Sequence, residues 1–518
     1  MRDKHHVMMV WLSTVLLILA GCAGNDTRSH GPAAYSTYSD SDWEQHRAEN
    51  VKAATSTMAS AMKGEKARLP GEKAILPGEK PAKQATVVLK ETTKPAAGPL
   101  QLSIEDALKL ARTRNQDVQT AEMEVEKARG EVMSAYSAVL PTLSLSGGYT
   151  RLGSVPEFEV SPGVFVEMGR ADNYRAGLTL NQPLYLGGKG RAALKIAKLY
   201  KHLSESGLKG AHTATAMAVR QAYYGLLHAQ EVVGSTTAQV TMARGHLADV
   251  EIKRAEGSAL ALHVMRARSG LSLAESGLIK TKADYETARR LLLKSLDLPL
   301  DTEVVLTSTY PDKPAAINVE DAMATALANR PDYVAALDSI SLQEQNLTIV
   351  KAGYKPNLIA FGDFTYTKPD SNLIGSNDWG DSWDAGARVS WTLFDGFNTR
   401  GQMIKERAEL RRLQIERDKL LLTIRSDVED AVAGLTSAND LVRARAVNLA
   451  EAEETLRLAK ESYEAGAATQ LDVLDAETGL VEASLAMADA RYVLGVAQAA
   501  YLAGIGLTDL PTRPAEEE

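Results

Sequence analysis

Two aspartates, Asp472 and Asp475, are the residues whose type and spacing first suggest a functional site. They lie three positions apart in a segment with helical periodicity, so their carboxylates project from one face of a helix. Carboxylates gathered around a pore attract and select cations. The same pair also fits an ordinary solvated helix face, so the spacing alone leaves both interpretations open.

The single cysteine, Cys22, is the second candidate because of what precedes it. A basic start leads into an apolar stretch, Val7 to Ala20, that is too short for a permanent membrane helix and is typical of a secretory signal. The sequence Leu19-Ala20-Gly21-Cys22 resembles the lipobox of bacterial lipoproteins. That resemblance implies cleavage before Cys22 and lipid on its sulfur and new amino group, and Ala23 gives no signal for retention in the inner membrane. The alternative is an ordinary signal with a chance cysteine.

No set of residues indicates catalysis, a metal site or a cofactor. The histidines of the helical region lack paired spacing and neighbouring acidic ligands; they are His202, His212, His228, His246 and His263. We therefore expect ordinary polar helix positions. The net charge is −8 and no basic block is present, which argues against a nucleic-acid partner.

The sequence is duplicated over most of its length. Leu102 to Ala107 (Leu-Ser-Ile-Glu-Asp-Ala) returns as Ile317 to Ala322 (Ile-Asn-Val-Glu-Asp-Ala). Later pairs, such as Gly257 with Gly466, keep a shift that is smaller by six residues, so a loop between two strands is shorter in the second copy. We expect one structural unit used twice.

Two long proline-free stretches, between Leu184 and Leu298 and between Phe397 and Leu510, carry Leu, Val and Ala at three- and four-residue spacings. This pattern is typical of coiled-coil helices, in which alanine permits close approach. Each stretch is broken once, at Gly257 and at Gly466, where we expect hairpin turns between antiparallel helices. A helix from Lys189 to Glu256 would be on the order of 100 Å long at about 1.5 Å per residue. No compact domain needs a rod of that length.

Four shorter segments alternate apolar and polar residues, which predicts strands with one apolar and one polar face. They are Thr142 to Thr150, Tyr174 to Asn181, Leu358 to Tyr366 and Asp384 to Leu393. Their length, roughly nine to eleven residues, suits a tilted strand that crosses a bilayer. An aromatic girdle would place aromatic residues near strand ends, as for Trp383, Trp391, Tyr185 and Phe394.

These strands cannot close a membrane barrel within one chain. A bilayer strand leaves no edge unpaired, and about eight strands are needed even for a filled barrel. Three chains of four strands would give twelve, which suits a pore. On periodicity alone, the edge of a soluble sandwich is the alternative.

The order of these features divides the chain. We expect a lipoprotein signal peptide at 1–21, a lipid-anchored tether at 22–100, one repeat at 101–310, a second at 311–511 and an acidic tail at 512–518. The tether is rich in spaced proline and glycine and has little apolar surface, so it is extended or disordered, or follows a fixed path around the folded body. The expected fold class is α+β and mostly α, with a long coiled-coil barrel and four membrane strands per chain.

This combination resembles the TolC-like outer-membrane factor family. The resemblance is carried by Tyr463 to Glu477 (Tyr-Glu-Ala-Gly-Ala-Ala-Thr-Gln-Leu-Asp-Val-Leu-Asp-Ala-Glu), which follows the family's helical-tip signature, and by Ala328 to Asp332, where Pro331 takes a first helical position. It implies a homotrimer in the outer membrane of a Gram-negative bacterium, with a twelve-stranded barrel continued by an α-helical tunnel. It also implies an efflux channel that works with a periplasmic adaptor (membrane fusion) protein and an inner-membrane pump.

The resemblance places Asp472 and Asp475 at a pore gate. In the family the matching acids line the periplasmic entrance, where threefold symmetry turns each residue into a ring. This chain keeps the family's aromatic at Tyr463 but lacks the arginine and the aspartate of the usual closing bonds, and it has His263 in the aspartate's place. The repeat shift pairs His263 with Asp472 and Arg266 with Asp475, so we expect two acids in one hairpin to face two bases in the other.

The hairpin tips are the expected docking surface for the adaptor, because small residues let another chain approach closely and the tunnel ends there. They comprise Gly257, Ser258, Ala259, Gly466, Ala467 and Ala468. The competing interpretation is a non-conducting coiled-coil lipoprotein that serves as an envelope scaffold. It leaves the four amphipathic strands without a role.

Overall fold

The computed structural model describes residues 99–509 except 156, 168, 312–317 and 371–376. By their contacts these residues belong to one unit, Leu89–Glu518. The signal peptide, Cys22, nearly all of the tether and the acidic tail that the sequence predicts lie outside the described residues.

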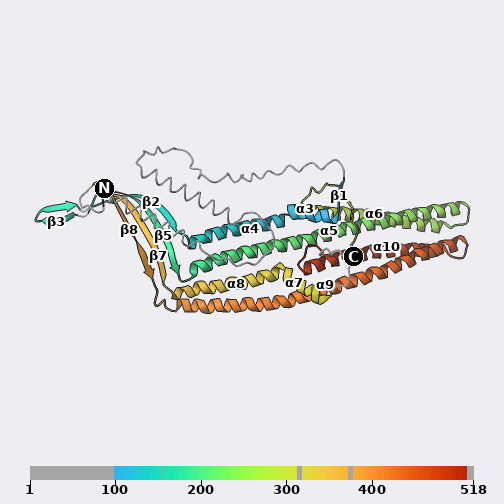
Figure 1. Ribbon diagram of the computed structural model, residues 1–518. Helices are drawn as coiled ribbons and strands as arrows, with labels where there is room; N and C mark the ends of the chain where they lie inside the picture. The colour runs from blue at the N-terminus through green and yellow to red at the C-terminus, as the bar shows by residue number, and fades with distance from the viewer. Residues whose placement is uncertain (1–98, 156, 168, 312–317, 371–376, 510–518) are drawn as a thin grey trace, which may run out of the picture. The chain divides into compact units, whose positions relative to one another are not determined.

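Helices dominate the described chain (Figure 1). Two of them, α5 (Lys189–Ala255) and α9 (Asn398–Glu464), have 67 residues each. Each turns at a glycine into a 35-residue helix, α6 (Ala261–Ser295) after α5 and α10 (Gln470–Gly504) after α9. The predicted long helices and their breaks are confirmed, and α5 ends one residue earlier than expected.

Four shorter helices precede the strands in two pairs. They are α3 (Ile104–Arg114) and α4 (Gln116–Ala135), then α7 (Val319–Asn329) and α8 (Pro331–Lys351). Single turns of 3-10 helix, η1 (Tyr136–Ala138) and η2 (Ala352–Tyr354), follow α4 and α8. Asparagine side chains cap the starts of α4 and α7, and Pro331 starts α8 because it has no N–H group to leave unpaired.

In the two halves, α5 and α9 have equal lengths, and so do α6 and α10. The shift that takes Gly257 to Gly466 also takes the first residues of α5 and α6 to the first residues of α9 and α10. We call the residue that this shift reaches the counterpart.

The central sheet is antiparallel in the order β2-β5-β7-β8. Its strands are β2 (Thr142–Arg151), β5 (Asp172–Leu186), β7 (Asn357–Lys368) and β8 (Gly380–Ser390). Pro183 of β5 cannot donate to the ladder, and the register with β7 shifts there. The outer strands β2 and β8 each have one edge that no other strand of the described chain pairs.

Cross-strand register gives this sheet one apolar and one polar face. One row across all four strands is apolar, Leu145, Leu178, Phe364 and Trp383. The adjacent row, on the opposite face, is polar, Ser144, Thr179, Asp363 and Asp384. The predicted alternation is confirmed, and the apolar face is open, because Leu145 is 80% exposed and Trp383 63% exposed.

The last predicted strand is shorter than expected. β8 ends at Ser390, so Trp391, Thr392 and Leu393 lie outside it. The indole nitrogen of Trp391 donates to the carbonyl oxygen of Tyr354 at 3.1 Å, which directs this segment to η2 and away from the ladder. Of the expected girdle residues, Tyr185 is near the end of β5, whereas Trp383 is inside β8 and Phe394 lies beyond it.

Two small sheets were not predicted. The loop between β2 and β5 contains a hairpin of β3 (Glu157–Ser161) and β4 (Val164–Glu167). Strand β1 (Leu100–Leu102) pairs in parallel with β6 (Val304–Leu306). The hydroxyl of Tyr223 on α5 donates to the Leu102 carbonyl oxygen at 3.1 Å, and Tyr223 is fully buried, so β1 is tied to the helical core.

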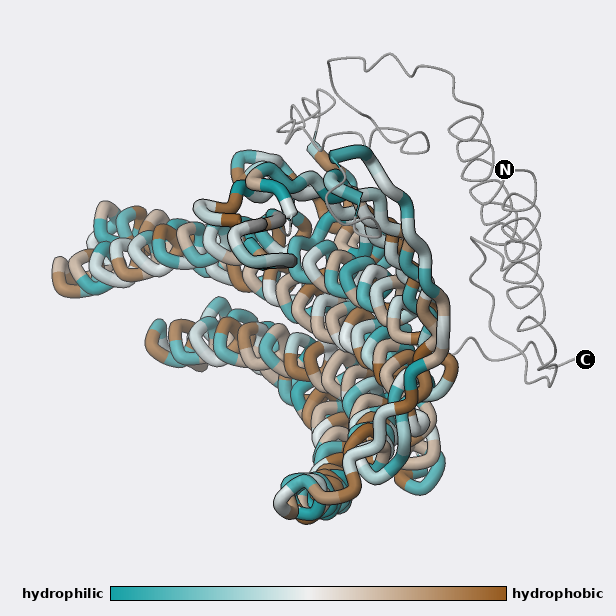
Figure 2. Tube along the Cα trace, turned by 90° about the vertical axis from the view of Figure 1, so that its left-hand side faces the viewer, coloured by the Kyte–Doolittle hydropathy of each residue, from teal (hydrophilic) through white to brown (hydrophobic). Residues whose placement is uncertain are grey.

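The helices pack in a fixed pattern around the long ones. α4 and α6 pack along α5, whereas α8 and α10 pack along both α5 and α9. Each long helix runs from a strand to a hairpin turn, so both turns lie at the helix ends far from the sheet (Figure 1). Figure 2 shows polar and apolar positions interleaved along the helices in view. No helix in the described ranges is long and apolar enough to cross a membrane.

Candidate gate and docking surface at the helical tips

Both helical tips use the same backbone turn. Gly257 and Gly466 have φ of 79° and 77°, the left-handed region that side chains with a Cβ rarely adopt. The amides that follow bond back to the end of the long helix, Ser258 to the Lys253 carbonyl and Ala467 to the Ser462 carbonyl, both at 2.8 Å. This satisfies carbonyls that a helix end leaves open.

The predicted docking residues are therefore accessible at two matching turns. Gly257, Ser258, Gly466 and Ala467 are exposed, and Ala259 and Ala468 are half-buried. Nothing lies within 4 Å of a Cβ built on either glycine, so backbone conformation and not crowding requires glycine.

Asp472 caps the start of α10. Its Oδ2 accepts from the amide and the hydroxyl of Thr469, both at 2.7 Å, and its own amide donates to the Thr469 hydroxyl at 3.3 Å. These bonds, first the one from the Thr469 hydroxyl, hold the pKa of the Asp472 carboxyl below its usual value. Such a reciprocal capping box fixes where the helix begins.

Asp475 faces a groove between α9 and α10 together with Asp472. The same groove is lined by Glu451, Glu482 and Arg445. Asp475 is exposed, so the predicted pair of carboxylates does share one accessible helix face. Its surroundings carry more negative than positive charge.

The predicted pairing of these acids with His263 and Arg266 is not formed within the described chain. His263 is half-buried and Arg266 exposed on α6, and neither makes a side-chain hydrogen bond or ion pair with a described residue. One oxygen of Asp472 is instead taken by Thr469.

Tyr463 links the two hairpins. Its hydroxyl oxygen accepts a hydrogen bond from the Lys253 ammonium at 2.6 Å, and the same nitrogen lies 4.0 Å from the centre of its ring. A second contact joins the hairpins nearby, where the Gln470 amide nitrogen lies 2.7 Å from Nε2 of His246. A cation and a phenol therefore connect α5 to α9 at the tips.

Residues 107–297 and 322–506 match the sequence model of the family described as "Outer membrane efflux protein". The chain belongs to this family. The resemblance to TolC-like outer-membrane factors is thus confirmed, and the family is one of efflux proteins of the outer membrane, not of enzymes.

This outer membrane efflux protein is similar to several named relatives along most of their length. It is 24% identical to "Outer membrane efflux protein BepC" of Brucella suis biovar 1 (strain 1330), over 82% of this chain and 89% of that one. It is 22% identical to "Probable outer membrane lipoprotein SilC" of Salmonella typhimurium, over 74% and 81%. Its fold is that of the Campylobacter jejuni CmeC outer membrane channel, with a TM-score of 0.66 at 18% identity, covering 78% of this chain and 85% of that one.

The helical histidines of this efflux protein mostly connect neighbouring helices. Nε2 of His228 lies 2.7 Å from Asp489 on α10, and Nδ1 of His202 lies 3.9 Å from Asp338 on α8. They are polar helix positions, as the sequence indicates. Among the described residues no group of three or more histidine, cysteine or acidic side chains is arranged to hold a metal ion.

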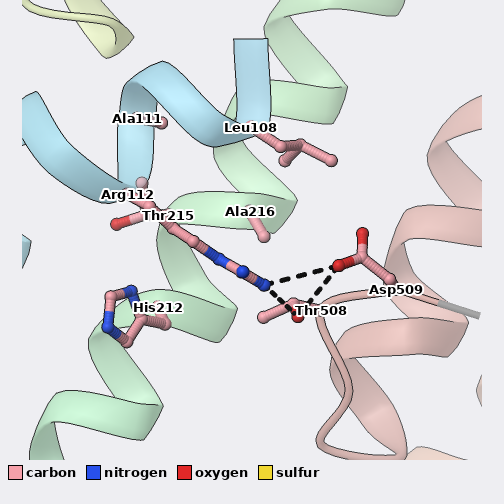
Figure 3. Close-up of a pocket in the computed structure, with 8 residues that line it drawn as sticks. All are labelled: Leu108, Ala111, Arg112, His212, Thr215, Ala216, Thr508 and Asp509. Carbon is pink, nitrogen blue, oxygen red and sulfur yellow. Dashed lines mark hydrogen bonds and ion pairs between the residues drawn. The ribbon is translucent and has the colours of Figure 1, made fainter. Parts of the chain in front are cut away.

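A small pocket lies between α3, α5 and the segment after α10, and side chains there connect the two halves of the chain (Figure 3). The Arg112 guanidinium donates to the Thr508 hydroxyl at 2.9 Å, and Arg220 pairs with Asp509 at 2.9 Å. These bonds hold the end of the second half against the first. Nδ1 of His212 is buried there without a hydrogen-bond partner, and burial together with the nearby Arg112 charge lowers the pKa of this histidine.

Two parts of the tips were not predicted from the sequence. The Asp472 cap had a visible signal, since Thr-x-x-Asp before an apolar run is a helix-start pattern. Lys253 had none, because its partner Tyr463 is distant in the sequence and nothing local marks a cation that meets a phenol.

Proposed function

We propose that this chain forms, as a homotrimer, the exit duct of a tripartite efflux system, which carries substrates from the cell across the periplasm and the outer membrane. The observation that carries the proposal is the four-stranded sheet, which has one apolar face and two edges that no other strand of the described residues pairs. Within a bilayer such edges must be paired, and three copies joined edge to edge give a closed barrel of twelve strands.

The proposed partners lie at the helical tips, away from the sheet. A periplasmic adaptor meets the exposed small residues at the Gly257 and Gly466 turns, and an inner-membrane pump supplies substrate beyond it. Asp472 and Asp475 form the acidic constriction of the duct, with Tyr463, His263 and Arg266 around it. In the trimer, His263 and Arg266 have acids of a neighbouring copy as available partners.

Lipid on Cys22 is a second attachment to the outer membrane. Cys22→Ser should abolish labelling of the chain by a radioactive fatty acid yet leave some assembled channel, because insertion of the sheet is independent of the lipid. Unchanged acyl labelling in this variant would remove the site.

The scaffold interpretation is the second candidate, and the sheet argues against it. A spacer needs long helices and an anchor, but it has no use for four strands whose apolar rows are open on one face.

Purified full-length protein in planar bilayers separates the two. The duct predicts a detergent-corrected mass of three chains and discrete conductance steps. A monomer, or a trimer that never conducts under any applied voltage or pH, would leave the scaffold as the better account.

A further inference from the structure

The 35-residue helices α6 and α10 differ in how many long helices they contact. α10 packs along both α9 and α5, whereas α6 makes its extended contact with α5. The lengths of α5 and α6 match those of α9 and α10. The contact between α5 and α10 inside the chain would therefore correspond to a contact between α9 and α6. A single chain does not form this second contact.

Exposure at counterpart positions locates this open face. Some counterpart positions of α6 and α10 are buried in both helices, as for Ala274 at 6% exposure and its counterpart Ala483 at 4%. Ala488 is next to Asp489, which contacts His228 of α5. Ala488 is 3% exposed, but its counterpart Ile279 is 73% exposed. A large apolar side chain on α6 thus stands in solvent where α10 is covered.

The long helices show the same difference. A Cβ on Gly225 of α5 would lie 3.9 Å from the ring of Tyr492 on α10. Its counterpart is also a glycine, Gly434 of α9, and nothing lies within 4 Å of a Cβ there. The α9 surface that corresponds to the α10-binding surface of α5 is therefore unoccupied in one chain.

The open faces of α6 and α9 carry complementary charges, arranged as in the contact between α10 and α5. Within the chain, Arg491 of α10 pairs with Glu231 of α5 at 3.3 Å. Their counterparts are Lys282 on α6 and Asp440 on α9, so the short helix again carries the base and the long helix the acid. Both are exposed; Lys282 has no ion pair with a described residue, and Asp440 pairs only with Arg443 one turn along its own helix.

We infer that α6 of one copy packs on α9 of the next copy in the register of the α10–α5 contact, with an ion pair between Lys282 and Asp440 of the neighbouring copy. This inference rests on the trimer of the proposed function and specifies its helical interface. Because the two faces differ, each copy uses α6 on one side and α9 on the other, an arrangement that closes into a ring. An exposed ion pair adds little stability, so its effect is to fix register and partner choice.

Site-directed cross-linking tests the register. Lys282→Cys with Asp440→Cys is treated with a short bismaleimide in membranes, alongside the wild type and each single variant. We expect bands of two and three chains on denaturing gels for the double variant alone. The matched control is Glu231→Cys with Arg491→Cys, at which the same geometry lies inside one chain and the product keeps the mass of one chain.

Charge exchange tests the pair itself. Asp440→Lys should reduce the fraction of trimer that survives mild detergent, and adding Lys282→Asp should restore most of it, which loss of the Arg443 contact alone would not explain. If trimers form but the double-cysteine variant stays monomeric on gels and the exchange gives no rescue, the inference is wrong while the exit duct stands. If the wild type has the mass of one chain, the duct fails as well.

Discussion

Asp472 is fixed by the helix that it caps, and this bears on how its charge behaves. Its folded-state pKa lies below the usual aspartate value near 4 because the bonds from Thr469 favour the carboxylate. A lowered pKa means that the stabilising contribution is complete above the unfolded pKa and is lost as pH falls through the folded pKa. Over the neutral range the cap is therefore constant, and any pH response of the tips has to come from another group.

Removing the cap should loosen the start of α10. Thr469→Ala is expected to cost about 1 kcal/mol of local stability, a typical value for loss of an N-cap side chain. Hydrogen exchange of the first amides of α10 measures it. The control is Leu260→Ala, since Leu260 is the counterpart of Thr469 and provides no side-chain cap to α6. Equal effects at the two positions would mean that the Thr469 bonds do not hold the helix start.

His263 lies on α6 at the proposed constriction. We expect its ring to help hold the tips closed, so His263→Ala should increase the single-channel conductance. Planar-bilayer recordings of the wild type and of His263→Ala test this. Equal conductance of the two would exclude His263 from the gate.

The aspartate ring is tested separately. Asp475→Asn should lower cation selectivity and block by multivalent cations, because it removes three carboxylates from the proposed constriction without touching the Thr469 cap. Asp475 is the better choice than Asp472 for this reason. Unchanged reversal potentials in a salt gradient would contradict a pore-lining position.

At the scale of elements, the alternation of rows across β2, β5, β7 and β8 makes the two faces of the sheet unequal. Leu145→Arg should cost about 2 to 4 kcal/mol if its row is near the bilayer midplane, whereas Ser144→Arg on the opposite face should be mild. Urea titration of the channel folded into lipid vesicles compares them. Similar tolerance at both positions would argue that the sheet is not in a bilayer.

How far the sequence could predict these elements depended on the range of the interactions. Proline-free stretches and the glycines at the tips predict α5, α6, α9, α10 and the turns between them, because helices and their caps are local. The ends of α6 and α10, at Ser295 and Gly504, come earlier than the ends of these stretches. The predicted end of β8 was wrong because Trp391 donates a hydrogen bond to Tyr354 in η2, a contact that the alternation of apolar and polar residues does not encode. Strands β1 and β6, three residues each, exist only as a pair brought together from distant parts of the chain.

For the whole molecule, the tips are where this chain is expected to meet another protein. Ala467→Trp and Ser258→Trp should abolish efflux in cells while leaving the assembled trimer, because bulk on an exposed turn blocks close approach. These positions are better than Gly257 and Gly466, where any side chain would strain a backbone with positive φ. Drug or metal tolerance of cells, with trimer content measured on the same membranes, gives the result.

A matched control is Met123→Trp on α4, which adds the same bulk to an exposed apolar position away from the turn. Efflux that survives tryptophan at both tips would place the docking surface elsewhere. So would cross-linkers at Ala468 that never capture an adaptor protein in cells.

The hairpin ion pairs of the two halves have opposite polarity. Glu251 of α5 pairs with Arg268 of α6 at 2.9 Å, and at the counterpart positions Lys460 of α9 pairs with Glu477 of α10 at 3.6 Å. During folding, a chain that contains the same hairpin twice can place α10 on the face of α5 where α6 belongs, or α6 on the face of α9 where α10 belongs. Those mispaired hairpins would set Glu251 against Glu477 and Lys460 against Arg268. Each native pair stabilises little by itself, but exchange replaces two attractions by two repulsions, so the reversal of charge discriminates against misfolded topologies of a duplicated chain.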